Sequence, residues 1–203
     1  LQDIASSDAG VVADMALINA HMRLRDVDKA LQAIDGLQKK RANDPLPHQL
    51  RGRALLLRND RAAARGSFEQ ALKIDPAYFA ATAALAALDI VDRKPQDAQQ
   101  RLEAVLKTNP ANAQALMALA EIQAGSGAGK QEVIDLIQKA IDAAPTDKTP
   151  RLMLVEYHLR QNDAKAALTS AQSAAVALPD VPELVDALGR AQAANGENNQ
   201  AMS

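Results

Sequence analysis

The sequence predicts an all-α fold in which antiparallel helix pairs follow one another as an α-solenoid. Alanine supplies 44 of the 203 residues, whereas the chain has two Phe, two Tyr and neither Trp nor Cys. Alanine is the strongest helix former, while strands draw on β-branched and aromatic residues. A fixed proline interval also indicates a repeated supersecondary unit. The prolines stand 34, 35 and 34 residues apart, at Pro76, Pro110, Pro145 and Pro179.

Each interval is broken near its middle by residues that favour a turn, which divides the repeat into two helices. Asp60 and Asp163 are placed to cap the second helix of their repeats, because a carboxylate accepts hydrogen bonds from the free N–H groups there. Pro95 suits the first turn of such a helix, where no backbone donor is needed. The expected breaks are Arg58-Asn59-Asp60, Arg93-Lys94-Pro95, Gly125-Ser126-Gly127, Gln161-Asn162-Asp163 and Asn195-Gly196-Glu197.

These signals divide the chain into full repeats and a partial one. The expected bounds are 11–44, 45–78, 79–112, 113–147 and 148–181, followed by a partial repeat over 182–203. Residues 1–10 are expected to end a preceding repeat or to cap the array. Because a cut solenoid exposes apolar surface, we expect the native array to continue beyond both ends.

Two repeats are expected to depart from the regular length. In the first, the second helix is predicted to extend through Lys39, Lys40 and Arg41 before Pro45. The fourth is one residue longer than the others, and the loop from Gly125 to Lys130 is the simplest place for the additional residue.

The second repeat carries small, aromatic and proline residues at places that characterise a known family. Counted from Pro45, Gly52 is at the eighth place, Ala64 at the twentieth, Phe68 at the twenty-fourth, Ala71 at the twenty-seventh and Pro76 at the thirty-second. In this pattern the chain resembles the tetratricopeptide repeat (TPR) family. The resemblance implies a right-handed superhelix in which small residues at the eighth and twentieth places let the paired helices approach closely.

The chain departs from the family at the eleventh place, which is usually aromatic. Packing at this place is therefore expected to be thinner than in a consensus repeat. The residues found there are Leu55, Asp89, Gln123, His158 and Gln192.

No constellation of residues in the sequence predicts catalysis, a cofactor or a metal. The segment Gly125–Lys130 lacks the leading Gly and the Ser or Thr of a phosphate-binding loop, and a helix rather than a strand precedes it. His21, His48 and His158 are far apart and have no His or Cys partner at a metal-ligand spacing. We therefore expect a non-enzymatic protein, with His21 and His158 packed among other side chains.

The TPR resemblance implies a groove lined by the second, fifth, sixth, ninth, twelfth and thirteenth residues of each repeat. In this chain most of those places hold apolar side chains, and a contiguous apolar surface usually marks a binding site. The expected groove residues are Leu46, Gln49, Leu50, Arg53, Leu56, Leu57, Ala80, Ala83, Ala84, Ala87, Ile90, Val91, Met117, Glu121, Leu152, Met153 and Glu156.

An apolar helix or extended protein segment is the expected occupant of this groove. Methionine side chains such as Met117 and Met153 can adapt to its shape. The alternative is a purely structural array, in which neighbouring repeats or a second copy of the chain cover the same surface.

A second candidate surface is basic. Between Lys39 and Arg65 the chain has eight Lys or Arg residues against Asp44 and Asp60. An ordinary solvated face explains such a run, and the alternative is an anionic partner such as an acidic polysaccharide, a lipid headgroup or an acidic protein tail. Nucleic acid is not expected, because the net charge is −2 and no aromatic stacking platform accompanies the cations. The candidate anion-binding residues are Lys39, Lys40, Arg41, Arg58, Arg61 and Arg65.

The segment from Gly52 to Gly189 also resembles the TPR-repeat lipoproteins of bacterial PEP-CTERM (exosortase) systems, through the runs 68–78, 84–89 and 119–121. This resemblance implies a scaffold in the periplasm or at the outer membrane, with a role in protein sorting or exopolysaccharide synthesis. It also implies a lipid anchor on an N-terminal Cys, which the present chain lacks. Composition and spacing alone leave the compartment open, the cytoplasm included.

Overall fold

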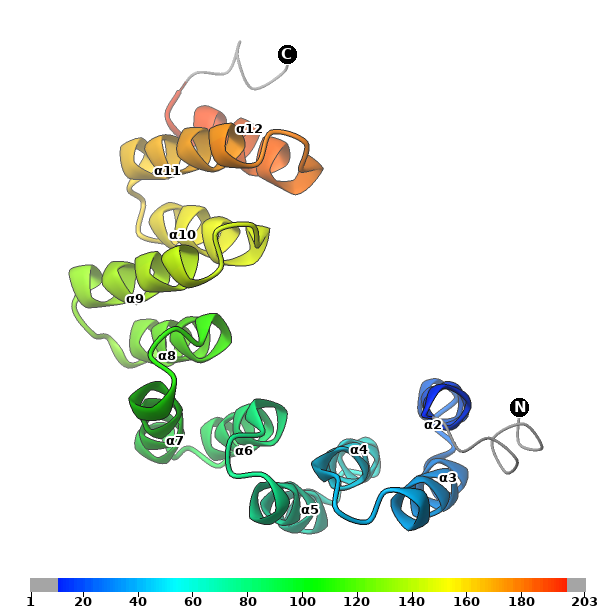
Figure 1. Ribbon diagram of the computed structural model, residues 1–203. Helices are drawn as coiled ribbons and strands as arrows, with labels where there is room; N and C mark the ends of the chain where they lie inside the picture. Colours follow the sequence, from blue (N-terminus) through cyan, green and yellow to red (C-terminus); the bar gives the residue numbers. More distant parts are fainter. Residues whose placement is uncertain (1–10, 197–203) are drawn as a thin grey trace. The chain divides into compact units, whose positions relative to one another are not determined.

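The computed structural model describes residues 11–196, and over this range the chain forms eleven α-helices and no strand (Figure 1). The expected all-α fold is therefore confirmed. We call the first helix of each repeat its A-helix and the second its B-helix. The segment expected to end a preceding repeat, 1–10, and the last part of the partial repeat, 197–203, lie outside the described residues.

The chain divides into two compact halves, residues 1–101 and 102–203, and each is described by itself. In the N-terminal half, α3, α4 and α5 each pack against the helix before and the helix after them. The A-helices α2, α4 and α6 follow one another along one side of this half in Figure 1, and α3 and α5 lie along the other. The bounds are α2 (Val12–Arg23), α3 (Val27–Lys40), α4 (Pro45–Leu57), α5 (Arg61–Ile74) and α6 (Phe79–Val91), followed by α7 (Pro95–Thr108), which begins in this half.

In the C-terminal half each helix from α8 to α12 packs against the next one along the chain. The A-helix α10 also contacts the A-helices α8 and α12, so the A-helices of this half form one layer. The bounds are α8 (Ala113–Ser126), α9 (Lys130–Ala143), α10 (Lys148–Arg160), α11 (Ala164–Ala177) and α12 (Pro182–Ala194).

Polar side chains start several of the helices as the sequence predicts. The Asp60 carboxylate accepts a hydrogen bond from the backbone N–H of Ala63, and the Asp163 carboxylate accepts one from Ala166, each at 3.1 Å. Both bonds satisfy a donor that has no partner within its helix. Helix α7 begins at Pro95, in agreement with the first-turn position expected for that proline.

Of the two predicted irregularities of repeat length, the structure contradicts the first and confirms the second. Helix α3 has 14 residues, as many as α5, and it ends at Lys40, so the expected extension through Arg41 is wrong. Pro45 instead opens α4, with Asp44 as its N-cap, because a proline is favoured at the first helical position. The additional residue of the fourth repeat lies where the sequence predicts, between Gly127 and Lys130. Helix α9 begins three residues after the left-handed Gly127, whereas α7 begins two residues after the left-handed Arg93.

The segment that follows each A-helix contains one residue in the left-handed backbone conformation. Glycine and asparagine adopt this conformation at the least cost, whereas an arginine there carries a steric penalty. In four of the six segments this residue is Gly or Asn, whereas in the other two it is Arg25 and Arg93. The φ angles are 55° at Arg25, 63° at Asn59, 59° at Arg93, 79° at Gly127, 54° at Asn162 and 85° at Gly196.

The helices of a pair approach closely where a small residue faces a large one. A Cβ atom added to Gly52 of α4 would lie only 2.4 Å from Cε1 of Phe68 on α5. Phe68 is completely buried, as are Ala64 and Ala71 on the same B-helix. The residues at the eighth, twentieth, twenty-fourth and twenty-seventh places of this repeat thus take the positions that close packing requires.

Replacement of Gly52 by Ala should destabilise the protein, because the added methyl group must displace the Phe68 ring or separate α4 from α5. We expect Gly52→Ala to lower the free energy of unfolding by about 1–3 kcal/mol, as overpacking typically does. Urea unfolding followed by circular dichroism measures the change.

Gly66→Ala is the matched control, since Gly66 lies inside α5 and no atom stands within 4 Å of an added Cβ. This change should stabilise the helix by about 0.4–1 kcal/mol. Equal losses of stability in the two variants would contradict the close approach at Gly52.

Candidate partner-binding surface

The expected groove residues all lie on A-helices, and the structure distributes them between exposed and half-buried positions, with one exception. Four of the eight half-buried members also pack against core clusters. Leu46, for example, packs against the first core cluster. The exposed members are Arg53, Leu56, Leu57, Ala80, Ala87, Ile90, Val91 and Glu121. The half-buried members are Leu46, Gln49, Ala83, Ala84, Met117, Leu152, Met153 and Glu156.

Leu50 is the exception and requires a correction. Its side chain is completely buried in a core cluster with Ile34 and Leu37 of α3, so it lines no surface. The reason is that the sixth place of this repeat faces the preceding B-helix. A leucine there contributes to stability through burial.

The C-terminal ends of the A-helices in the N-terminal half expose aliphatic side chains. Leu56 and Leu57 end α4 with 37% and 40% of their surface exposed, and Ile90 and Val91 end α6 with 41% and 52%. Leu24, directly after α2, is 77% exposed. We call these five residues the aliphatic edge.

Ion pairs between successive repeats show that these helix ends lie at one edge of the N-terminal half. Arg58, directly after α4, pairs with Asp28 in the first turn of α3. Arg65 of α5 pairs with Asp92, directly after α6. The first pair brings the turn after α4 beside the start of α3, and the second brings the turn after α6 beside the N-terminal part of α5. The ends of α4 and α6 therefore lie along the same edge of this half.

The C-terminal half places its expected groove residues in a different setting. Met153 packs against the core cluster around Ile137, and Leu152 packs against the cluster around Leu168. Glu156 forms an ion pair with Arg190 of α12, whereas Glu121 is exposed. This half therefore offers a more polar and less open A-helix surface.

Most of the candidate anion-binding residues already have carboxylate partners. Lys40 pairs with Asp14 and Arg41 with Asp44. As described above, Arg58 and Arg65 hold carboxylates of the neighbouring repeats. Among the described residues, only Lys39 and Arg61 of this set have no ion pair. The six cations are thus mostly structural, and the structure does not assemble them into an open basic patch.

A sequence profile described as "Tetratricopeptide repeat" matches residues 15–79 and 83–148 of the chain. The chain belongs to the tetratricopeptide repeat family. The TPR resemblance inferred from Gly52, Ala64, Phe68, Ala71 and Pro76 is confirmed, and the fold is the TPR solenoid. TPR proteins are generally non-catalytic scaffolds.

Solved structures share this fold at low sequence identity. The chain is 25% identical to MamA residues 41–end from Desulfovibrio magneticus RS-1, with a TM-score of 0.57, covering 81% of this chain and 92% of that one. Yeast Tom70 matches with a TM-score of 0.78 at 15% identity, covering 94% of this chain and 41% of Tom70. PilW, described as a type IV pilus biogenesis factor, matches with a TM-score of 0.68 at 16% identity over 94% of this chain and 88% of PilW. No curated protein sequence matches the chain.

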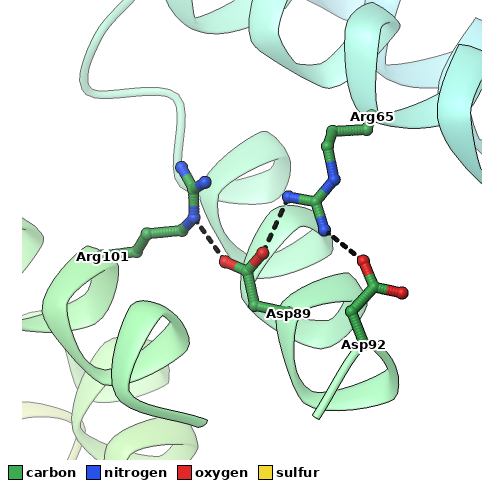
Figure 2. A network of polar contacts seen from close by, with 4 residues as sticks. All are labelled: Arg65, Asp89, Asp92 and Arg101. Atoms are coloured by element: carbon green, nitrogen blue, oxygen red, sulfur yellow. Dashed lines mark hydrogen bonds and ion pairs between the residues drawn. The ribbon is translucent and has the colours of Figure 1, made fainter. Parts of the chain in front are cut away.

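The eleventh TPR place of the third repeat holds a buried carboxylate with a network of cations around it (Figure 2). The Asp89 side chain is 2% exposed, and it accepts hydrogen bonds from Arg65 at 2.7 Å and from Arg101 at 2.6 Å. Arg65 also donates to Asp92 at 2.8 Å. Sequence analysis identified Asp89 only as a departure from the usual aromatic. The arginines, 24 residues before it and 12 after it, were the signal that could have indicated the network.

The pKa of Asp89 lies below its ordinary value of 3.8 even though the group is buried. Burial disfavours the charged carboxylate and by itself raises the pKa. The hydrogen bonds from Arg101 and Arg65, together with their positive charges, outweigh that effect and lower it. Asp89 is therefore held ionised, and it joins α5, α6 and α7 through charge.

The histidines occupy packing positions rather than a metal site. His158, at the eleventh TPR place of its repeat, is 6% exposed beside the ring of Tyr157, and burial lowers its pKa. His21 is half-buried. Within residues 11–196 the structure brings no three His, Cys, Asp or Glu side chains together in a way that could hold a metal ion. No helix in the described part of the chain is long and apolar enough to span a membrane.

Neutralisation of Asp89 should destabilise the protein, because two arginines would then face an uncharged amide. We expect Asp89→Asn to lower the free energy of unfolding by up to about 3 kcal/mol, the lower end of the loss that follows when a buried ion pair is broken. Thermal and urea unfolding at pH 7 measure this loss. Asp28→Asn is the control, since Asp28 is 89% exposed in its pair with Arg58 and should change stability by less than about 1 kcal/mol.

The effect of Asp89→Asn should also depend on pH. Because the folded-state pKa of Asp89 is lowered, its stabilisation is present above the unfolded value of 3.8 and is lost as the pH falls through the folded-state pKa. The difference in stability between wild type and Asp89→Asn should therefore shrink below about pH 4. A difference that stays constant down to pH 2 would contradict an ionised Asp89.

Proposed function

We propose that the chain is a non-catalytic scaffold that binds a protein or peptide partner along the A-helices of its N-terminal half. The observation that supports this most directly is the aliphatic edge, where Leu56, Leu57, Ile90 and Val91 are exposed at the ends of successive A-helices. Exposure of these side chains to water contributes nothing to the stability of the array. An aligned apolar surface of this kind is the usual mark of an interaction site.

The mechanism is burial of a partner's apolar side chains on helices that are already in place. Packing between the A- and B-helices fixes the spacing of the aliphatic residues before the partner arrives, so little ordering entropy is lost on the scaffold side. A few of these residues should supply most of the affinity. The partner is an apolar helix or an extended segment that lies along the edge.

The resemblance of residues 52–189 to TPR lipoproteins of PEP-CTERM systems supports a setting for this scaffold. We place the partner in a bacterial envelope system for protein sorting or exopolysaccharide synthesis, in the periplasm or at the outer membrane. An anionic polysaccharide is a weaker candidate for direct binding, because Arg58 and Arg65 already hold carboxylates. Self-association through the same edge is the remaining alternative.

A charge placed in the middle of the surface should abolish partner capture. Ala87 is exposed on α6, three and four residues before Ile90 and Val91, and therefore shares their helix face. We expect immobilised wild type, but not Ala87→Glu, to retain a specific protein from a cell extract of the source organism. Mass spectrometry identifies the retained protein, and circular dichroism confirms that both forms are folded.

The matched control is Ala104→Glu, which introduces the same charge at an exposed position of the B-helix α7. It should capture the partner as the wild type does. Equal capture by wild type and Ala87→Glu would contradict the proposed surface. Self-association of the wild type that Ala87→Glu abolishes would point to a second copy of the chain as the occupant.

A further inference from the structure

The A-helices of the N-terminal half expose cations and hide their carboxylates. Helices α2, α4 and α6 contain only two acidic residues, Asp14 and Asp89, which are 4% and 2% exposed. Asp14 is paired with Lys40, and Asp89 is paired with two arginines. Arg53 of α4 is exposed, and its side chain forms no ion pair with the described residues. It lies three and four residues before Leu56 and Leu57, on the same helix face.

Two further cations stand in the turns beside the aliphatic edge. Arg25 directly follows Leu24, and Arg93 lies two residues after Val91. Both are exposed, and neither side chain has an ion pair or hydrogen bond within residues 11–196. Together with Arg53 they place unneutralised positive charge along the exposed aliphatic side chains.

The backbone conformation at Arg25 and Arg93 is unfavourable for an arginine. Both residues are in the left-handed conformation, with φ of 55° and 59°. The corresponding segments place Asn or Gly there, which relieves the strain. Strained non-glycine residues concentrate at functional sites, because selection there acts on the side chain rather than on stability.

At the corresponding places, the C-terminal half does not combine exposed aliphatic side chains with unpaired cations. Glu121 and Glu156 stand where α4 has Arg53, and Arg190, at the same place of α12, is paired with Glu156 and Asp186. In α10, Leu159 stands where α4 has Leu56 but packs against the core, and Arg160 stands where α4 has Leu57. Ala124 and Gly125 of α8 stand where α4 has Leu56 and Leu57. The joint pattern of exposed aliphatic side chains and unpaired cations thus belongs to the N-terminal half.

We infer that this surface binds an acidic amphipathic protein segment. The partner's aliphatic side chains would pack against the aliphatic edge, and its carboxylates would lie beside Arg25, Arg53 and Arg93. Opposite charges speed the encounter and fix the register, whereas a basic segment would place like charges together. An anionic polysaccharide would meet the cations but leave the aliphatic edge in water. The inference rests on the proposed function and adds to it the sign of the partner's charge.

The experiment compares two fluorescent synthetic peptides of about 18 residues, longer than the ~12–15 residues at which isolated helices are marginal. They share the same leucines at helical spacing and carry either glutamate or lysine at all other positions. Fluorescence anisotropy measures their binding to the wild-type chain at low salt. We expect the acidic peptide to bind at least about tenfold more tightly than the basic one, with an affinity that falls as salt is raised.

The double variant Arg25→Asn, Arg93→Asn separates binding from stability. Asparagine occupies the same left-handed place at Asn59 and Asn162, so the variant should fold and melt at or above the wild-type temperature. Its affinity for the acidic peptide should fall about fivefold, as expected for the loss of two exposed charge contacts. The control Lys73→Asn, Lys107→Asn removes the same charge from exposed positions on B-helices and should leave the affinity unchanged.

Three other outcomes of these experiments would overturn the inference. Equal binding of both peptides, weakened for both by Ala87→Glu, would uphold the proposed function but reject an acidic partner. Equal weakening by the double variant and by its control would show a general charge effect rather than a site. Failure of both peptides to bind would also reject the inference, while the capture experiment with Ala87→Glu tests the proposed function independently.

Discussion

The close approach of the A- and B-helices is the constraint on which the other features depend. Gly52 brings the backbone of α4 against the ring of Phe68, and buried alanines on α5 keep that contact tight. Once the pair is fixed at this distance, the short segment between the helices needs one left-handed residue to reverse the chain. The same reversal places the ends of α4 and α6 at one edge. The position of the aliphatic edge is thus set by the packing of Gly52 against Phe68, a contact in which the side chains of the edge take no part.

The charge on the exposed face of the A-helices in the N-terminal half depends on which carboxylates the helix packing buries. Asp14 and Asp89 are removed from the surface of the A-helices, and each is neutralised by cations from the neighbouring B-helices. Those contacts stabilise the array. Because both carboxylates are buried and paired, neither of them neutralises the charge of Arg53. The buried ion pairs therefore stabilise the fold, and they leave the exposed face of these A-helices with a positive charge.

Sequence analysis could predict the features that depend on local periodicity and not those that depend on which neighbour a side chain meets. The proline interval and the caps at Asp60 and Asp163 predicted the helix pairs. Leu50 was placed in the groove because the family pattern names its position, whereas its burial depends on α3, which the pattern does not describe. The arginine contacts of Asp89 were missed because no local rule joins residues 12 and 24 positions apart. The left-handed backbone of Arg25 and Arg93 was not predicted, because a backbone angle is not visible in composition.

Ion pairs that cross from repeat to repeat give the array a fixed order. Asp89 requires Arg65 from the helix before it and Arg101 from the helix after it. Lys130 of the fourth repeat likewise reaches Asp163 of the fifth. A gene duplication, deletion or exchange that moved the third repeat to another position would separate the buried carboxylate of Asp89 from Arg65, while Arg101 would move with it. Although the repeats share one architecture, the second and third are therefore not interchangeable modules.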